Sequence, residues 1–268
     1  MLSILTIVGP AHGAAPPTPI DLVRALTDGS AVVKSGEVLY RVDRAGVVRD
    51  TWDPSRSGEQ VFVVDVSADG RWVELGLGQT RWLHRWKDRA PVAEVTGGEV
   101  YLCPGAWWQV RRDQPSRRFD LASRAWSPVP LDAARFDPDA CFGDALIGSG
   151  QSGTEVVSPS GAVRALPDPV RSEPAGPSVP GGLVFRPRAD GGTLLRVGPD
   201  LAVSAGPPAD RHGDAFYAAG TWGVLDDGQL TLTGSGPARS FEGHAISVDP
   251  SGAGVWVVTQ AGVRWVPL

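Results

Sequence analysis

A short pattern recurs seven times along this 268-residue chain, and it limits the possible fold more than any other feature. Each copy consists of an apolar strand-like run, a polar turn and a second run. Equivalent positions in successive copies lie 43, 36, 38, 38, 37 and 33 residues apart. These positions are Tyr40, Leu83, Phe119, Val157, Leu195, Leu232 and Trp265. Such regular spacing is typical of an array of similar supersecondary units.

The residues between these positions favour strands over helices. The chain contains 34 glycines and 24 prolines, which interrupt helices. Apolar residues alternate between these breaks. Four strands fit the second unit, at residues 61–66, 72–77, 81–85 and 91–95, and four fit the sixth, at 215–218, 222–225, 230–233 and 238–241.

A small four-stranded antiparallel sheet cannot bury both of its faces alone, whereas sheets stacked radially around an axis can. The sequence therefore predicts an all-β fold with one β-propeller domain over residues 16–268. Seven four-stranded blades fit the repeat, and six or eight remain open. The seventh unit has no evident outer strand before Leu268. Residues 18–26 either supply that strand and close the ring, or form the innermost strand of the first blade.

The last unit resembles a degenerate repeat of the WD40 and related propeller families. Gly243-His244 stands where those repeats carry Gly-His, residues 249–252 resemble their hairpin, and Trp265 resembles their final tryptophan. Residues 67–70 carry the same hairpin signature. The resemblance implies a propeller fold. The resemblance implies no functional residue, because Val266 stands where the Trp-Asp ending has its aspartate.

Net charge and apolar segments limit which partners and which cellular compartment the sequence predicts. A net charge of −5 argues against nucleic acid as a partner, and no apolar run is long enough to be a transmembrane helix. Residues 1–15 resemble the latter part of a secretory signal peptide, with an apolar run at 2–8. We therefore expect a periplasmic or secreted protein. The alternative is a cytoplasmic protein with a strand-like or disordered N-terminus.

The two cysteines occupy equivalent positions in neighbouring units. Cys103 lies sixteen residues before Phe119, and Cys141 lies sixteen before Val157. On a propeller both fall near the innermost strands of adjacent blades, where a disulfide is a geometric option. An oxidised pair fits an exported protein. The alternative is two unpaired cysteines packed in the core.

Tryptophan and arginine are concentrated in the second and third units. A surface that mixes these residues is typical of a binding site for a protein, peptide or glycan. The alternative is that the tryptophans fill the space between blades and the arginine stems pack over them. The predicted contact residues are Trp82, Trp86, Trp107, Trp108, Arg111 and Arg112.

The main functional hypothesis is a monomeric, non-catalytic binding scaffold without a cofactor. No metal site is predicted, since no histidine lies at ligand spacing from another ligand. The alternative is a hydrolase- or lyase-type propeller enzyme with its site at the central channel. Its first candidate residues are Asp137, Asp139, His212 and Asp214.

Overall fold

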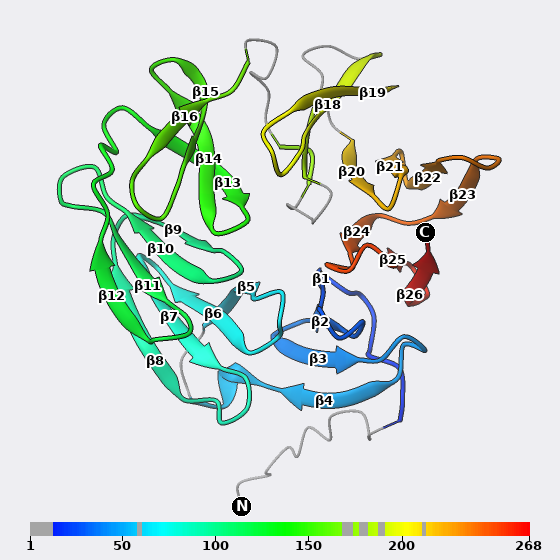
Figure 1. Ribbon diagram of the computed structural model, residues 1–268. Helices are drawn as coiled ribbons and strands as arrows, with labels where there is room; N and C mark the ends of the chain where they lie inside the picture. The colour runs from blue at the N-terminus through cyan, green and yellow to red at the C-terminus, as the bar shows by residue number, and fades with distance from the viewer. Residues whose placement is uncertain (1–12, 58–60, 168–173, 177–181, 187–190, 211–212) are drawn as a thin grey trace, which may run out of the picture.

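In the computed structural model, seven antiparallel sheets surround a common axis, as the sequence predicts (Figure 1). The structure describes residues 13–57, 61–167, 174–176, 182–186, 191–210 and 213–268. Within these residues, the 3-10 helix η1 (Pro54–Ser57) is the one helical element. The protein is therefore an all-β, seven-bladed β-propeller.

Blades 1 to 4 each contain four strands in chain order from the channel outwards. Blade 1 consists of β1 (Leu22–Ala25), β2 (Ala31–Ser35), β3 (Val38–Val42) and β4 (Val48–Trp52). Blade 2 consists of β5 (Phe62–Val66), β6 (Trp72–Leu77), β7 (Thr80–Arg85) and β8 (Pro91–Thr96). Blade 3 consists of β9 (Glu99–Leu102), β10 (Ala106–Val110), β11 (Arg117–Asp120) and β12 (Ala125–Pro128). Blade 4 consists of β13 (Asp137–Phe142), β14 (Ala145–Gly150), β15 (Gly153–Val157) and β16 (Val163–Ala165).

Blades 5 and 7 have three assigned strands each among the described residues, and blade 6 has four. Blade 5 consists of β17 (Leu183–Phe185), β18 (Gly192–Val197) and β19 (Val203–Ala209). Blade 6 consists of β20 (Asp214–Ala218), β21 (Thr221–Asp226), β22 (Gln229–Thr233) and β23 (Arg239–Glu242). Blade 7 consists of β24 (Ala245–Val248), β25 (Gly254–Thr259) and β26 (Gly262–Pro267).

Blade 5 gains a short inner segment that precedes its first assigned strand. Pro174 forms an isolated antiparallel bridge with Phe185, and Ala175 N–H donates to Val184 O at 2.7 Å. On its other side, Ala175 O accepts from Ala215 N–H of blade 6 at 2.8 Å. Counted with this segment, β18 is the third strand of its blade. The seven aligned sequence positions therefore all lie in third strands, which confirms the repeat.

Large apolar side chains fill the space between neighbouring blades. Trp72 and Leu83 of blade 2 share one buried cluster with Trp107 and Phe119 of blade 3. A comparable cluster joins blade 1 to blade 7 through Trp256, which is fully buried. Each sheet thus buries a face only in the presence of its neighbours, which is the physical reason for the ring.

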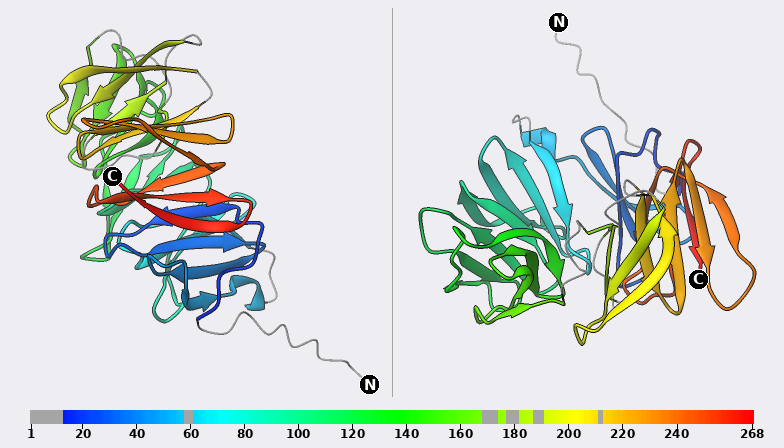
Figure 2. Two further views of the ribbon diagram at one scale, coloured as in Figure 1. Left: turned by 90° about the vertical axis from the view of Figure 1, so that its right-hand side faces the viewer. Right: turned by 90° about the horizontal axis from the view of Figure 1, so that it is seen from above.

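The first and last blades meet through their inner strands. Ala25 N–H of β1 donates to Ser247 Oγ of β24 at 2.8 Å, and this bond is buried. Figure 2 shows the blue strands of blade 1 beside the orange and red strands of blade 7. β1 pairs with β2 along its whole length, so it is the innermost strand of blade 1. The prediction that residues 18–26 supply the outer strand of the last blade is therefore wrong. The short 26–30 turn between β1 and β2 makes their local pairing entropically cheaper than pairing with a distant blade.

Candidate functional site

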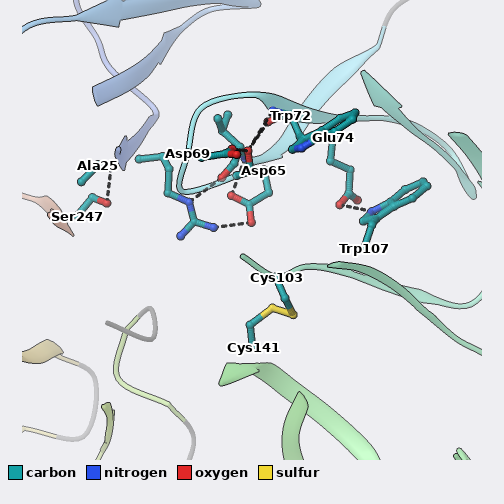
Figure 3. A network of polar contacts seen from close by, with 12 residues as sticks. Ala25, Asp65, Asp69, Trp72, Glu74, Cys103, Trp107, Cys141 and Ser247 are labelled. Atoms are coloured by element: carbon teal, nitrogen blue, oxygen red, sulfur yellow. Dashed lines mark hydrogen bonds and ion pairs between the residues drawn. A yellow bond between two sulfur atoms is a disulfide. The ribbon is translucent and has the colours of Figure 1, made fainter. Parts of the chain in front are cut away.

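A disulfide joins blades 3 and 4 at the wall of the central channel. Cys103 follows β9 and Cys141 lies in β13, and their Cα atoms are 5.4 Å apart (Figure 3). The repeat places both residues at the channel ends of adjacent blades, which is why two cysteines 38 residues apart in sequence can meet. The disulfide adds a covalent link between two blades that are also joined by the Tyr101 hydroxyl, which donates to Pro138 O at 2.7 Å.

The predicted tryptophans do not form a common surface, because they pack into three different gaps between neighbouring blades. Trp107 is fully buried between blades 2 and 3, and Trp108 is fully buried between blades 3 and 4. Trp86 is buried between blades 1 and 2, and Trp82 is half-buried against the same cluster. Trp86, Trp107 and Trp108 are therefore covered by neighbouring blades, whereas Trp82 remains partly exposed.

The two predicted arginines lie away from those tryptophans. Arg111 is half-buried, and its guanidinium donates to Gln114 Oε1. Arg112 is exposed and lies 3.7 Å from Asp137 Oδ1, across the gap between blades 3 and 4. These two positions remain untested predictions for a contact region.

Three residues predicted for an enzyme lie in inner strands, Asp137 and Asp139 in β13 of blade 4 and Asp214 in β20 of blade 6. Asp137 forms its ion pair with Arg112, and Asp214 forms one with Arg186 at 3.0 Å. His212 lies outside the described residues, as do residues 1–12 of the predicted signal peptide. No group of three or more His, Cys, Asp or Glu side chains in the described part of the chain could hold a metal ion.

A groove of about 640 Å³ lies between blades 2 and 3, on the face that carries the β5–β6 and β7–β8 turns. Its walls come from these two turns and from the β9–β10 and β11–β12 turns of the next blade. Trp72 and Trp86 contribute to its lining although most of each indole is buried. We call this feature the basic groove. Its charged lining residues are Arg41, Arg71, Arg85, Lys87 and Arg124, with Asp69 and Asp88.

Positive charge in the basic groove is only partly compensated. Arg41 forms an ion pair with Asp28 at 2.6 Å and Arg85 forms one with Asp88, while Arg71 lies 3.7 Å from Asp69 with its side chain 81% exposed. Lys87 and Arg124 are exposed and form no ion pair with any described residue. The Arg124 guanidinium lies 6.0 Å from the centre of the Trp72 ring, so it remains available above an aromatic surface. Part of the Trp and Arg cluster noted in the sequence therefore lines a groove, and Trp86 is the one predicted contact residue among its described lining residues.

A second pocket, of about 280 Å³, opens where the inner strands of blades 1 to 4 meet. Asp65 in β5 and Glu74 in β6 are directly opposed in the strand register, and both line this pocket (Figure 3). Arg24 of blade 1 donates to Asp65 Oδ2 at 2.8 Å, and Trp107 Nε1–H donates to Glu74 Oε2 at 2.9 Å. We call it the channel pocket.

Burial shifts the ionisation of both carboxyl groups. Loss of hydration raises the pKa of Glu74 to about 7, the Trp107 hydrogen bond opposes the rise, and the charge of Asp65 adds to it. Burial also raises the pKa of Asp65, although Arg24 counteracts it. The Asp65 side chain is 30% exposed and lines the channel pocket.

Sequence reasoning missed Asp65 and Glu74 although a signal existed. Each carboxylate interrupts an apolar strand, in FVVDV and in WVELGL. A charged residue in the middle of a buried run is costly unless it is paired, so its presence indicates a specific role. The partners that complete the pocket come from other blades and could not be assigned from local pattern.

Comparisons with known proteins identify the fold. The sequence matches no protein-family profile and no curated protein. A solved streptogramin B lyase is similar with a TM-score of 0.61 and 12% identity, covering 94% of each chain. The surface protein PorZ of the type-IX secretion system of Porphyromonas gingivalis matches with a TM-score of 0.58 and 11% identity over 93% of this chain and 38% of that one.

A third similar structure is the β-propeller domain of Cps50 (Swd1) from Myceliophteria thermophila. Its TM-score is 0.54 at 12% identity, and 97% of this chain and 98% of that chain are covered. The neighbours include a lyase, a secretion component and a β-propeller domain, so they share an architecture rather than an activity. At these identities the likeness shows the fold alone: the chain is a seven-bladed β-propeller.

Proposed function

We propose that this protein is a non-catalytic binding scaffold that holds an acidic segment of a partner protein in the basic groove. The observation that carries the proposal is the charge of the groove. Five of its lining residues are basic and two are acidic, on a chain whose net charge is −5. A local potential of opposite sign to the whole molecule attracts a complementary segment to one place.

The position of the groove also supports this function. Its walls are turns, which can vary without disturbing the sheets, and those turns rest on buried tryptophans that hold them in place. Lys87 and Arg124 reach the groove from neighbouring blades, so a bound segment would span the boundary between them. An extended acidic peptide fits such a boundary.

Binding of a fluorescent deca-glutamate peptide tests the proposal. The double variant Lys87→Glu, Arg124→Glu should weaken binding at least tenfold, and rising salt should weaken binding to the unaltered protein. The matched control is Arg164→Glu, Arg239→Glu, which makes the same charge change on exposed residues in the outer strands of blades 4 and 6. Equal losses in both variants, or no binding to the unaltered protein, would refute the assignment of the groove.

We further propose that the protein is exported. Support comes from the Cys103–Cys141 disulfide, since such bonds persist in oxidising compartments. The full chain expressed in its native host should be found outside the cytoplasm, with both thiols blocked to a maleimide reagent until a reductant is added. A cytoplasmic protein with two reactive thiols would refute export.

A further inference from the structure

The channel pocket combines an apolar wall with a small set of charged groups. Val64, Val100 and Leu102 contribute apolar surface from the inner strands of blades 2 and 3. Arg24, Asp65 and Glu74 contribute the charges. A confined volume of about 280 Å³ with this lining suits a small molecule rather than a macromolecule.

One oxygen of Glu74 is buried and accepts no hydrogen bond. The Glu74 side chain is 2% exposed, and Oε2 accepts from Trp107, but Oε1 has no hydrogen-bond partner. The nearest cation is Arg81, whose Nε lies 3.8 Å from Oε1. Arg81 Nη1 donates instead to Gly78 O and Thr80 O, at 2.8 and 3.2 Å. A buried acceptor left in this state is unfavourable and calls for an external donor.

Asp65 places a second carboxylate on the same side of the sheet. It is directly opposite Glu74 in the β5–β6 register, and such pairs have Cβ atoms roughly 4.5–5.5 Å apart. Both Asp65 oxygens already accept bonds, from Arg24 Nη2 and from Val66 N–H. Each retains a lone pair, because a carboxylate oxygen can accept two hydrogen bonds. Asp65 therefore retains acceptor capacity in the pocket that Glu74 also lines.

We propose that the channel pocket binds a small primary amine in its ammonium form, which donates to Glu74 Oε1 beside Asp65 while its hydrocarbon part contacts Val64, Val100 and Leu102. An ammonium group is compact and carries three donors, which matches one vacant oxygen and a neighbouring carboxylate. An anion would be repelled by the two carboxylates, and Arg24 is already paired with Asp65. A hard metal ion requires more oxygen ligands than the pocket supplies.

The ionisation of Glu74 supports this choice. Its pKa of about 7 means that the free pocket holds a partly protonated acid at neutral pH. A bound ammonium favours the carboxylate form, as a nearby opposite charge does. The groups that face Glu74 are Trp107, Asp65 and Arg81. Amine affinity should therefore increase between pH 6 and pH 8, until the amine itself loses its proton.

Titration with n-butylammonium, followed by the ¹H–¹⁵N signal of the Trp107 indole, tests the proposal. That N–H bonds to Glu74, so it reports on this pocket and not on the basic groove. The signal is assigned by its loss in Trp107→Phe. We expect a saturable shift with n-butylammonium and none with 1-butanol or butyrate at equal concentration. Failure of deca-glutamate binding would leave this result unaffected, so the two proposals can fail separately.

Two variants complete the test. Glu74→Gln should reduce n-butylammonium affinity at least tenfold while retaining a partner for the Trp107 indole. Glu94→Gln, an exposed position on β8 of the same blade, should retain the affinity of the unaltered protein. The proposal is overturned if no saturable shift occurs, if Glu74→Gln binds as well as the unaltered protein, or if butyrate gives the same shift.

Discussion

The Trp107 indole of blade 3 donates to the Glu74 carboxylate of blade 2 at 2.9 Å, and both side chains are buried. This bond ties the two blades beside the channel and partly offsets the loss of hydration at Glu74. It also leaves one carboxylate oxygen without a hydrogen bond. The bond therefore stabilises a charged group that remains costly to the fold.

Glu74→Gln should increase stability at neutral and higher pH. The pKa of Glu74 is about 7 in the folded protein, above its ordinary value of 4.5. Since the unfolded chain releases this proton first, stability falls as pH rises from about 4.5 to 7 and then levels off. The difference is on the order of 3 kcal/mol at most. Urea denaturation at pH 5 and pH 8 should show the gain at pH 8 alone, and none for Glu94→Gln.

Loss of the disulfide should destabilise the ring. Cys103 and Cys141 close a loop with a sequence separation of 38 residues, for which the chain-entropy argument gives about 4 kcal/mol. The double variant Cys103→Ala, Cys141→Ala should melt at a lower temperature than the oxidised protein. Reductant should lower the melting temperature of the unaltered protein and leave that of the variant unchanged. An unaltered protein insensitive to reductant would contradict a bond that supports the fold.

Ser247→Ala should weaken the junction between the first and last blades. The substitution removes the acceptor of the buried Ala25 N–H, and an unsatisfied buried donor costs about 1–3 kcal/mol. Amide hydrogen exchange in β1 should accelerate more than in β9, which lies two blades away. Ser235→Ala, at an exposed turn of blade 6, serves as the control. Uniform acceleration in β1 and β9 would indicate global destabilisation instead.

Trp107→Ala should cost about 3–5 kcal/mol, because it leaves a cavity between two sheets and removes the donor to Glu74. Arg112→Ala should change stability by less than about 0.5 kcal/mol, because Arg112 is exposed. Chemical denaturation of both variants separates core from surface within the predicted contact set. A nearly neutral Trp107→Ala would contradict the burial described above.

The sequence predicts the fold well because blade strands are short, local and alternating. The four strands expected at residues 61–95 match β5 to β8 to within about two residues at each end, as each depends only on its own apolar pattern and turns. The position of Cys103 relative to Cys141 follows from the same repeat. Functional surfaces depend instead on contacts between blades. The alternation of β10 places Trp107 and Trp108 on opposite faces of blade 3, but it cannot show that neighbouring blades cover both.

The assignment of residues 18–26 also shows what a local sequence pattern cannot predict. The sequence leaves residues 18–26 either in the outer strand of the last blade or in the innermost strand of the first, and the pairing of β1 with β2 gives the second location. Similar sequence patterns in two strands do not show where each strand lies within its blade. That position follows from the pairing of each strand with its neighbours, which is known only from the structure.

Because β1 belongs to its own blade, every described sheet is assembled from consecutive residues, and no sheet borrows a strand from across the ring. The chain could therefore begin and end between any two blades without dividing a sheet. Circular permutants that join residue 268 to residue 16 through a flexible linker and open the chain in the 129–136 connection should still close, with the Ala25–Ser247 contact as an internal joint.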